Sequence, residues 1–124
     1  MPHDMYLNNV KSVIRGLKDA YTELYEEVIL EYDRVNLRIR IRFLSGYLLE
    51  LNEAVILEAE QIKHLDYRYH FQDRENKLVF RYDNTPHFPD IGSFPHHKHL
   101  KDNVISSVKP SILGVIEEAR MKAY

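Results

Sequence analysis

The 124-residue chain contains no cysteine, so it forms neither a disulfide framework nor a thiolate metal site. No apolar run approaches the roughly 20 residues needed to span a bilayer, and no apolar signal-peptide segment follows Met1. The formal net charge is −2, which argues against an overall basic nucleic-acid binder. These absences predict a soluble, cytoplasmic protein that does not enter a membrane.

A chain of this length can bury one hydrophobic core without staples, so we expect a single domain over 1–124. Its expected parts are an N-terminal helix region (1–22), an antiparallel sheet (23–83), a loop rich in histidine and proline (84–100), and a C-terminal segment with a helix (101–124). The fold class is therefore α+β: a meander of about five or six antiparallel strands with a helix at each end.

Helices are predicted at both ends of the chain. Apolar residues at helical spacing indicate a helix from Asp4 to Leu17. Pro110 suits the first turn of a closing helix. The apolar stripe of that closing helix is expected to contain Ile112, Leu113, Ile116, Ala119 and Met121.

The clearest predicted strand is Val35–Phe43, in which apolar and polar residues alternate. The residues that follow suit a three-residue hairpin loop with Gly46 in the left-handed conformation. This hairpin would pair Ile41 with Leu49 and keep the apolar residues on one face.

Three arginines, Arg38, Arg40 and Arg42, share the other face of that strand. They would line a groove that binds a nucleic-acid backbone. The alternative is a solvated face with cross-strand pairs such as Arg40 with Glu50.

Two later segments are less distinct. Ala54–Leu65 alternates as a strand does but also contains helix-forming residues; we favour a strand that continues from Tyr47, with a turn near Glu60–Lys63. Val104–Val108 is expected to be an edge strand or coil.

The runs Tyr67–Gln72 and Lys77–Asp83 alternate between apolar and polar residues and flank a polar turn, which predicts a hairpin. The expected register pairs Tyr69 with Phe80. All the large apolar side chains then lie on one face, which a buried face requires.

The other face of this hairpin would carry Arg68 opposite Arg81 and His70 opposite Val79. Two arginines across a ladder repel each other unless an anion lies between them. Asp83 provides that charge in a purely structural arrangement, whereas a phosphate provides it in a functional one.

Five of the seven histidines fall between residues 67 and 100, and four of them follow the hairpin. Asn84 and His87 flank Pro86, and His96, His97 and His99 follow Pro95. Proline fixes the backbone and disfavours helix in the residue before it, so an extended loop with set directions is expected. A loop of such residues held over a sheet is a common place for acid–base chemistry or metal ligation.

These segments resemble the TumE family of prokaryotic toxin–antitoxin proteins. The resemblance rests on Tyr67–Asp73, Phe80–His87 and Phe94–His99, with the upstream pattern Leu37–Phe43. Where members often have a second histidine, this chain has Phe88. The resemblance implies a small toxin that acts on RNA as a growth inhibitor and is neutralised by an antitoxin.

Three functional hypotheses follow, and the first is an RNA-cleaving toxin that needs no metal. Histidine has an unperturbed pKa near 6.5, which suits both proton-transfer roles at neutral pH. His70 and His97 would be the acid–base pair. Arg81 and Arg68 would bind the phosphate, and Asp83 would orient a histidine or an arginine.

The second hypothesis is a metal-dependent nuclease or phosphoesterase. The histidines of the loop and Asp83 offer nitrogen and oxygen ligands for zinc or a related ion. Adjacent His96 and His97 point opposite ways on an extended segment, so only one of them readily shares a face with His99. The spacing matches no known zinc motif, so no cofactor is assigned and a divalent metal remains the alternative.

The third hypothesis is a binding module without catalysis, which grips an antitoxin or a nucleic acid or accepts a partner's strand at an exposed edge. A homodimer through such an edge or through the first helix is a further expectation. The candidate catalytic residues are His70, Arg81, Asp83, His87, His96, His97 and His99, and the candidate substrate-binding residues are Arg68, Asn84, Arg38, Arg40 and Arg42.

Overall fold

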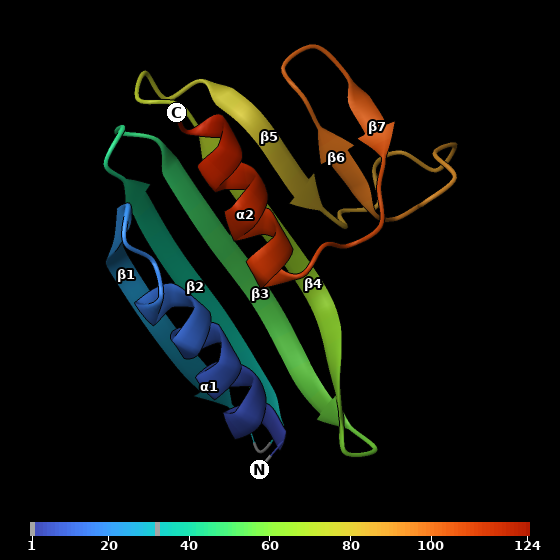
Figure 1. Ribbon diagram of the computed structural model, residues 1–124. Helices are drawn as coiled ribbons and strands as arrows, with labels where there is room; N and C mark the ends of the chain where they lie inside the picture. Colours follow the sequence, from blue (N-terminus) through green and yellow to red (C-terminus); the bar gives the residue numbers. More distant parts are fainter. Residues whose placement is uncertain (1, 32) are drawn as a thin grey trace.

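The computed structural model describes residues 2–31 and 33–124, and these form two helices and one antiparallel sheet of seven strands in chain order (Figure 1). The elements are α1 (Pro2–Arg15), β1 (Ala20–Leu30), β2 (Arg34–Phe43), β3 (Leu48–Glu58), β4 (Gln61–Gln72), β5 (Leu78–Asp83), β6 (His97–His99), β7 (Val104–Ser106) and α2 (Ile112–Lys122). The predicted α+β meander with a helix at each end is confirmed, with seven strands instead of five or six. Within the described residues, no helix is long and apolar enough to cross a membrane.

Both helices lie on the same face of the sheet, which leaves the other face without a helix (Figure 1). We call these the helix-covered face and the helix-free face. The alternation predicted for β2 explains which face the helices cover, because its apolar side chains lie on that face. Leu37, Ile39 and Ile41 are almost fully buried under the helices. Val10 of α1 and Ile116 of α2 complete this core, whose removal from water is the main driving force for folding.

The closing helix begins slightly later than predicted. The Ser111 hydroxyl accepts a hydrogen bond from the Gly114 backbone N–H at 3.0 Å and caps the helix, so Pro110 precedes the cap and does not lie in the first turn. The prediction that Leu113 and Met121 are buried is wrong, because their side chains are 51% and 82% exposed. The buried stripe of α2 is Ile112, Val115, Ile116 and Ala119.

The β2–β3 hairpin forms in the predicted register, with Ile41 opposite Leu49. Gly46 has the left-handed φ of +95° that the loop requires. The ambiguous segment 54–65 is strand on both sides of a turn, as favoured, but the turn is at Ala59 and Glu60, between β3 and β4.

The β4–β5 hairpin forms with a register different from the predicted one. Tyr69 lies opposite Tyr82, two residues beyond its expected partner Phe80. One residue of the difference comes from the loop, where Asn76 adopts a left-handed φ of 66° and the Asp73 N–H donates to the Lys77 carbonyl oxygen at 2.9 Å.

The other residue comes from a β-bulge at Val79, since Gln72 pairs with Leu78 whereas Phe71 pairs with Phe80. The two shifts leave the residues from Phe80 onward on their predicted faces but change every partner. Before the bulge the predicted faces are wrong, because Leu78 lies opposite Gln72 on the helix-free face and Val79 packs against the core. The expected pairs of Arg68 with Arg81 and of His70 with Val79 are therefore wrong. Arg68 lies opposite Asp83, and His70 lies opposite Arg81.

The predicted loop over 84–100 does not stay a loop to its end. His97–His99 form β6, which pairs with β5, and β7 pairs with β6. The expected strand near 104–108 is present as Val104–Ser106. The histidine segment thus extends the sheet, and its side chains alternate between the two faces.

Candidate functional site

Two rows of polar side chains cross the helix-free face, because residues directly opposite one another on neighbouring strands point the same way. The Asp83 row runs from β2 to β6 through Arg38, Asn52, Arg68, Asp83 and His97. The Arg81 row runs beside it through Arg40, Glu50, His70, Arg81 and His99. The row between them faces the helices, where Tyr82 and Lys98 contact Glu118 of α2.

Unpartnered polar atoms gather in the Arg81 row. Among the described residues, four buried side-chain atoms have no hydrogen-bond partner, and three of these are Arg40 Nε, His70 Nδ1 and Arg81 Nε. Arg81 Nε is 3.8 Å from Asp83 Oδ2, which allows an ion pair but is too long for a hydrogen bond. Because buried polar groups are normally hydrogen-bonded, this row offers two N–H donors to a bound anion, and it offers the His70 nitrogen to a group that carries a proton.

The hydrogen bonds around His70 define its tautomer. Gln72 Nε2 donates to Asn76 Oδ1 at 2.9 Å, which turns the Gln72 oxygen toward His70. His70 Nε2 lies 2.9 Å from that oxygen and donates to it. The neutral ring of His70 therefore presents an unshared pair at Nδ1, as a general base requires.

The pKa of His70 is lowered from its usual value, first by burial and then by the positive charges of Arg68 and Arg81. The hydrogen bond to Gln72 and the charge of Glu50 oppose this shift only in part. Histidine titrates near 6.5 in water, so His70 is neutral at pH 7.

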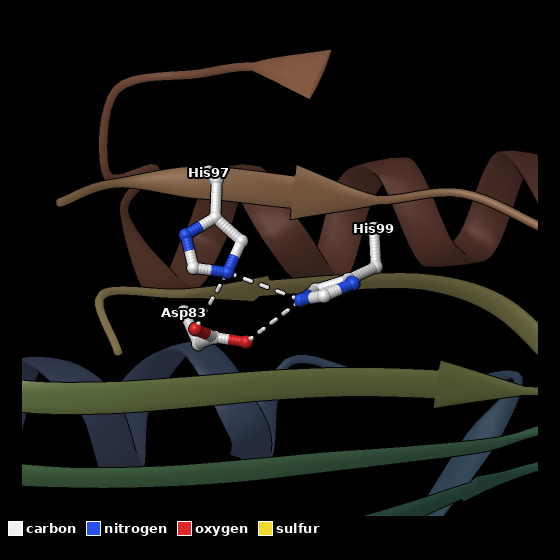
Figure 2. A group of neighbouring side chains, drawn as sticks. All are labelled: Asp83, His97 and His99. Carbon is white, nitrogen blue, oxygen red and sulfur yellow. Dashed lines mark hydrogen bonds and ion pairs between the residues drawn. The ribbon is translucent and has the colours of Figure 1, made fainter. Parts of the chain in front are cut away.

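At the end of the two rows, Asp83 of β5 and His97 and His99 of β6 point toward one another (Figure 2). We call these three residues the Asp–His cluster. His97 Nε2 is 2.9 Å from Asp83 Oδ1 and 3.0 Å from His99 Nε2, and His99 Nε2 is 3.4 Å from Asp83 Oδ2. His97 is 1% exposed and Asp83 is 5% exposed, so the cluster lies largely inside the protein.

The orientation of His97 is set by the turn before it. Its Nδ1 lies 2.9 Å from the Pro95 carbonyl oxygen, which can only accept, so this nitrogen carries a proton. On the outer side, the ring of Phe88 contacts His97 and His99 edge to face, at centroid distances of 5.0 and 5.8 Å. Phe88 thus forms an apolar wall beside the cluster.

Strand β6 is held from its other face by Lys98. Its Nζ donates to Glu118 Oε2 at 2.6 Å and lies 4.8 Å from the centre of the Tyr82 ring. Burial alone would lower the pKa of Lys98, but the hydrogen bond to Glu118 raises it above its usual value. The charged amine ties β6 to α2 and so fixes the strand that carries His97 and His99.

Other candidate residues lie outside this centre. His87 is exposed, and His96 Nδ1 lies 2.8 Å from the Tyr67 hydroxyl, whose side chain faces the helices. The Asn84 amide accepts from the Tyr67 backbone N–H at 3.2 Å and donates to the Leu65 carbonyl at 3.1 Å, which connects the loop to β4.

The three arginines of β2 each have an acidic neighbour. Arg40 Nη2 lies 3.5 Å from Glu50, as the solvated alternative expected. Arg38 lies 3.9 Å from Glu26, and Arg42 lies 3.1 Å from Glu23, both of which belong to β1. Arg68 is exposed. A hollow of about 450 Å³ opens beside it, and its polar lining includes Asn52, Asp66, Arg68, Asn84 and Thr85.

A second polar cluster was not predicted and lies on the helix-covered face. Glu53 is 4% exposed and accepts hydrogen bonds from the hydroxyls of Tyr69, at 2.5 Å, and Tyr6. Burial alone would raise the pKa of Glu53, but hydrogen bonds from His64, Tyr6 and Tyr69 lower it. The alternation of β3 was the sequence feature from which this cluster could have been predicted, because Glu53 occupies an apolar position of that pattern.

A family model for a toxin matches residues 12–121, which is most of the chain. That model is described as Toxin TumE, and the chain belongs to this family. Searches of curated proteins and of solved structures find no match to the chain. The resemblance recognised in the sequence is thus confirmed, and membership of a toxin family implies an antitoxin as partner.

Proposed function

We propose that the chain is an RNA-cleaving growth inhibitor whose Arg81 row binds the scissile phosphate. The observation that carries this proposal is the order His70, Arg81, His99 on three neighbouring strands. Opposite residues of an antiparallel pair have Cβ atoms about 4.5–5.5 Å apart, so Arg81 has an imidazole on each side. A guanidinium is the group best suited to hold a phosphate in a fixed orientation.

In the proposed reaction, His70 Nδ1, which is buried in the free protein, becomes exposed when RNA binds and takes the proton of the ribose 2′-hydroxyl. The 2′-oxygen forms a bond to phosphorus, and the bond from phosphorus to the 5′-oxygen breaks. The charge that develops on the phosphate is stabilised by Arg81. The 5′-oxygen leaves on the side of the Asp–His cluster, where it receives a proton from water. The products are a 2′,3′-cyclic phosphate and a 5′-hydroxyl.

His97 takes a different role in this proposal from the one expected for an acid–base pair. A ring that is 1% exposed, with Nδ1 bound to the Pro95 carbonyl, offers no free atom to a substrate. We assign it as a positioning residue that holds Asp83 and His99. Exposed Arg68 and the hollow beside it extend the candidate RNA surface away from the cluster.

The test is cleavage of RNA by purified protein and by the variants His70→Ala and Arg81→Ala. Removal of the general base His70 costs about 10²–10⁴-fold in rate, and removal of Arg81 takes away the group that stabilises charge on the phosphate, so both variants are expected to lose cleavage and growth inhibition. His87→Ala is the matched control, because its exposed ring lies outside both rows. Circular dichroism must show that each variant is folded.

Unchanged cleavage by both folded variants would refute the assignment of the site. Binding of RNA without cleavage by the wild type, with and without added metal, would support the non-catalytic binding module instead. A 2′,3′-cyclic phosphate end on the product distinguishes attack by the 2′-hydroxyl from attack by water.

A further inference from the structure

We propose that Asp83, His97 and His99 bind one divalent transition-metal ion. The role of the ion rests on the proposed function, because it would stabilise the leaving oxygen beside the Arg81 row, but binding itself stands on geometry. One ligand atom from each of the three residues lies within 4.8 Å of the other two.

The separations fit a shared ion. Zinc and related ions bind imidazole nitrogen and carboxylate oxygen at about 2.0–2.2 Å, which puts neighbouring ligand atoms about 2.9–3.5 Å apart at octahedral or tetrahedral angles. The two imidazole nitrogens are 3.0 Å apart, and each lies near a different Asp83 oxygen, His97 Nε2 2.9 Å from Oδ1 and His99 Nε2 3.4 Å from Oδ2. These spacings suit two imidazoles and a carboxylate that binds the same metal through both of its oxygens.

The tautomer of His97 gives a second, independent reason. Because Nδ1 carries a proton for the Pro95 carbonyl, the neutral ring presents a lone pair at Nε2. That nitrogen faces Asp83 Oδ1, which is also an electron donor, and His99 Nε2. One added proton can bridge His97 to only one of these atoms at a time, whereas a metal ion accepts electron pairs from all three.

The surroundings have the features of a metal site. A ligating histidine typically donates its other ring N–H to a carbonyl or a carboxylate, as His97 does to Pro95. Phe88 covers both imidazoles and lowers the local polarity. Arg81 lies beside Asp83, so a phosphate that bridges the ion and the guanidinium would offset part of their positive charge.

The donor set selects the kind of ion. Two imidazoles and one carboxylate suit zinc, manganese or iron(II) and leave coordination positions for water or a phosphate oxygen. Calcium and magnesium prefer oxygen ligands, so they are expected to bind weakly. A bound ion would act as a Lewis acid on the phosphate or the leaving oxygen, while His70, on β4, keeps its role as the base.

The test is direct metal binding by protein purified without a histidine tag. Chelator-treated protein is titrated with zinc chloride and with manganese chloride by calorimetry, and bound metal is counted by mass spectrometry. We expect about one ion per chain. Even outer residues of a metal site affect affinity about 10–100-fold, so His99→Ala and Asp83→Asn are expected to weaken binding by at least about 100-fold.

His97→Ala removes a buried ring and can also weaken the fold, so the partly exposed His99 is the main test position. His96→Ala is the control, because that ring contacts Tyr67 on the other face. Unchanged binding in His96→Ala together with loss in His99→Ala supports the site. Absence of bound metal in the wild type, or equal binding by wild type and His99→Ala, overturns it.

RNA cleavage measured in parallel, with EDTA and with added metal, separates this inference from the proposed function. Metal binding without any cleavage supports the metal site and refutes the ribonuclease. Cleavage in EDTA by a protein that binds no metal supports the ribonuclease and refutes the metal site. Cleavage that requires the ion bound by the Asp–His cluster supports both, and a wild-type protein that neither binds metal nor cleaves RNA refutes both.

Discussion

His96 and His97 are consecutive residues whose rings contact opposite faces of the sheet. His96 Nδ1 lies 2.8 Å from the hydroxyl of Tyr67 on the helix-covered face, whereas His97 Nε2 lies 2.9 Å from Asp83 Oδ1 on the helix-free face. The alternation of extended backbone produces this separation. Two neighbouring residues of the same type therefore allow a comparison of the two faces.

The first prediction concerns the growth of cells that express the toxin without its antitoxin. Replacement of His99 in the Asp–His cluster by alanine is expected to reduce toxicity and RNA cleavage by at least about 10-fold, because it removes a ligand of the proposed ion. His96→Ala should stay toxic, since its ring lies away from both polar rows. Equal toxicity of the two variants at equal protein levels would contradict the role of the cluster.

The second prediction is the pH dependence of cleavage. The base form of His70 is neutral, and burial together with Arg68 and Arg81 lowers the pKa of that ring. The rate at low substrate should thus be flat near pH 7 and fall as pH drops through a value below 6.5. Removal of one positive charge in Arg68→Gln should raise the pKa of His70 and move this acid limb to higher pH.

Arg38→Gln is the control for that measurement, because Arg38 lies in the Asp83 row two strands away from Arg68. The remaining groups around His70, namely Gln72, Glu50 and Arg81, are unchanged in both variants. An acid limb in the same position for Arg68→Gln and wild type would show that His70 is not the titrating base.

The third prediction concerns stability and the buried Glu53. Tyr69 is 0% exposed, and its hydroxyl donates to Glu53 at 2.5 Å. Tyr69→Phe removes one donor from a buried carboxylate, which is expected to lower the free energy of unfolding by about 1–3 kcal/mol in urea denaturation. Tyr25→Phe should cost less, since its partner Glu27 is only partly buried. Equal losses of unfolding free energy in the two variants would show that the hydrogen bond to buried Glu53 stabilises the fold no more than the bond to Glu27.

The fourth prediction compares two glycines. Gly46 has a φ of +95°, and an added Cβ would lie 3.1 Å from Arg74 Cβ, so Gly46→Ala is expected to destabilise the fold by about 1–3 kcal/mol. Around Gly92 no atom lies within 4 Å of such a Cβ, and Gly92→Ala should change stability by less than about 0.5 kcal/mol. Thermal unfolding of both variants measures the difference.

The sequence was most informative where structure depends on neighbours in the chain. The alternation of Val35–Phe43 and the position of Gly46 together specify the β2–β3 hairpin, because both signals are local. The face of each aromatic residue on β4 and β5 was predicted correctly for the same reason. The cross-strand partners of these residues were predicted wrongly, because neither the left-handed Asn76 nor the bulge at Val79 has a strong local signature.

The candidate site was accessible to sequence reasoning only in part. Strand β6 has three residues, too few to show a period, and it follows Pro95, so it was expected to be loop. Contact between Asp83 and His97 arises from the pairing of β5 with β6, which no local pattern encodes. What the sequence did supply was the residue types and the expectation that one of His96 and His97 would share a face with His99.

The bulge in the β4–β5 hairpin also bears on how this family can change. Without Val79, Leu78 and Phe80 would become consecutive residues opposite Gln72 and Phe71, so Phe80 would stay beneath the helices and Arg81 and Asp83 would stay on the helix-free face. Relatives that lack the extra residue should therefore keep the same contact between the β6 histidines and the β5 carboxylate.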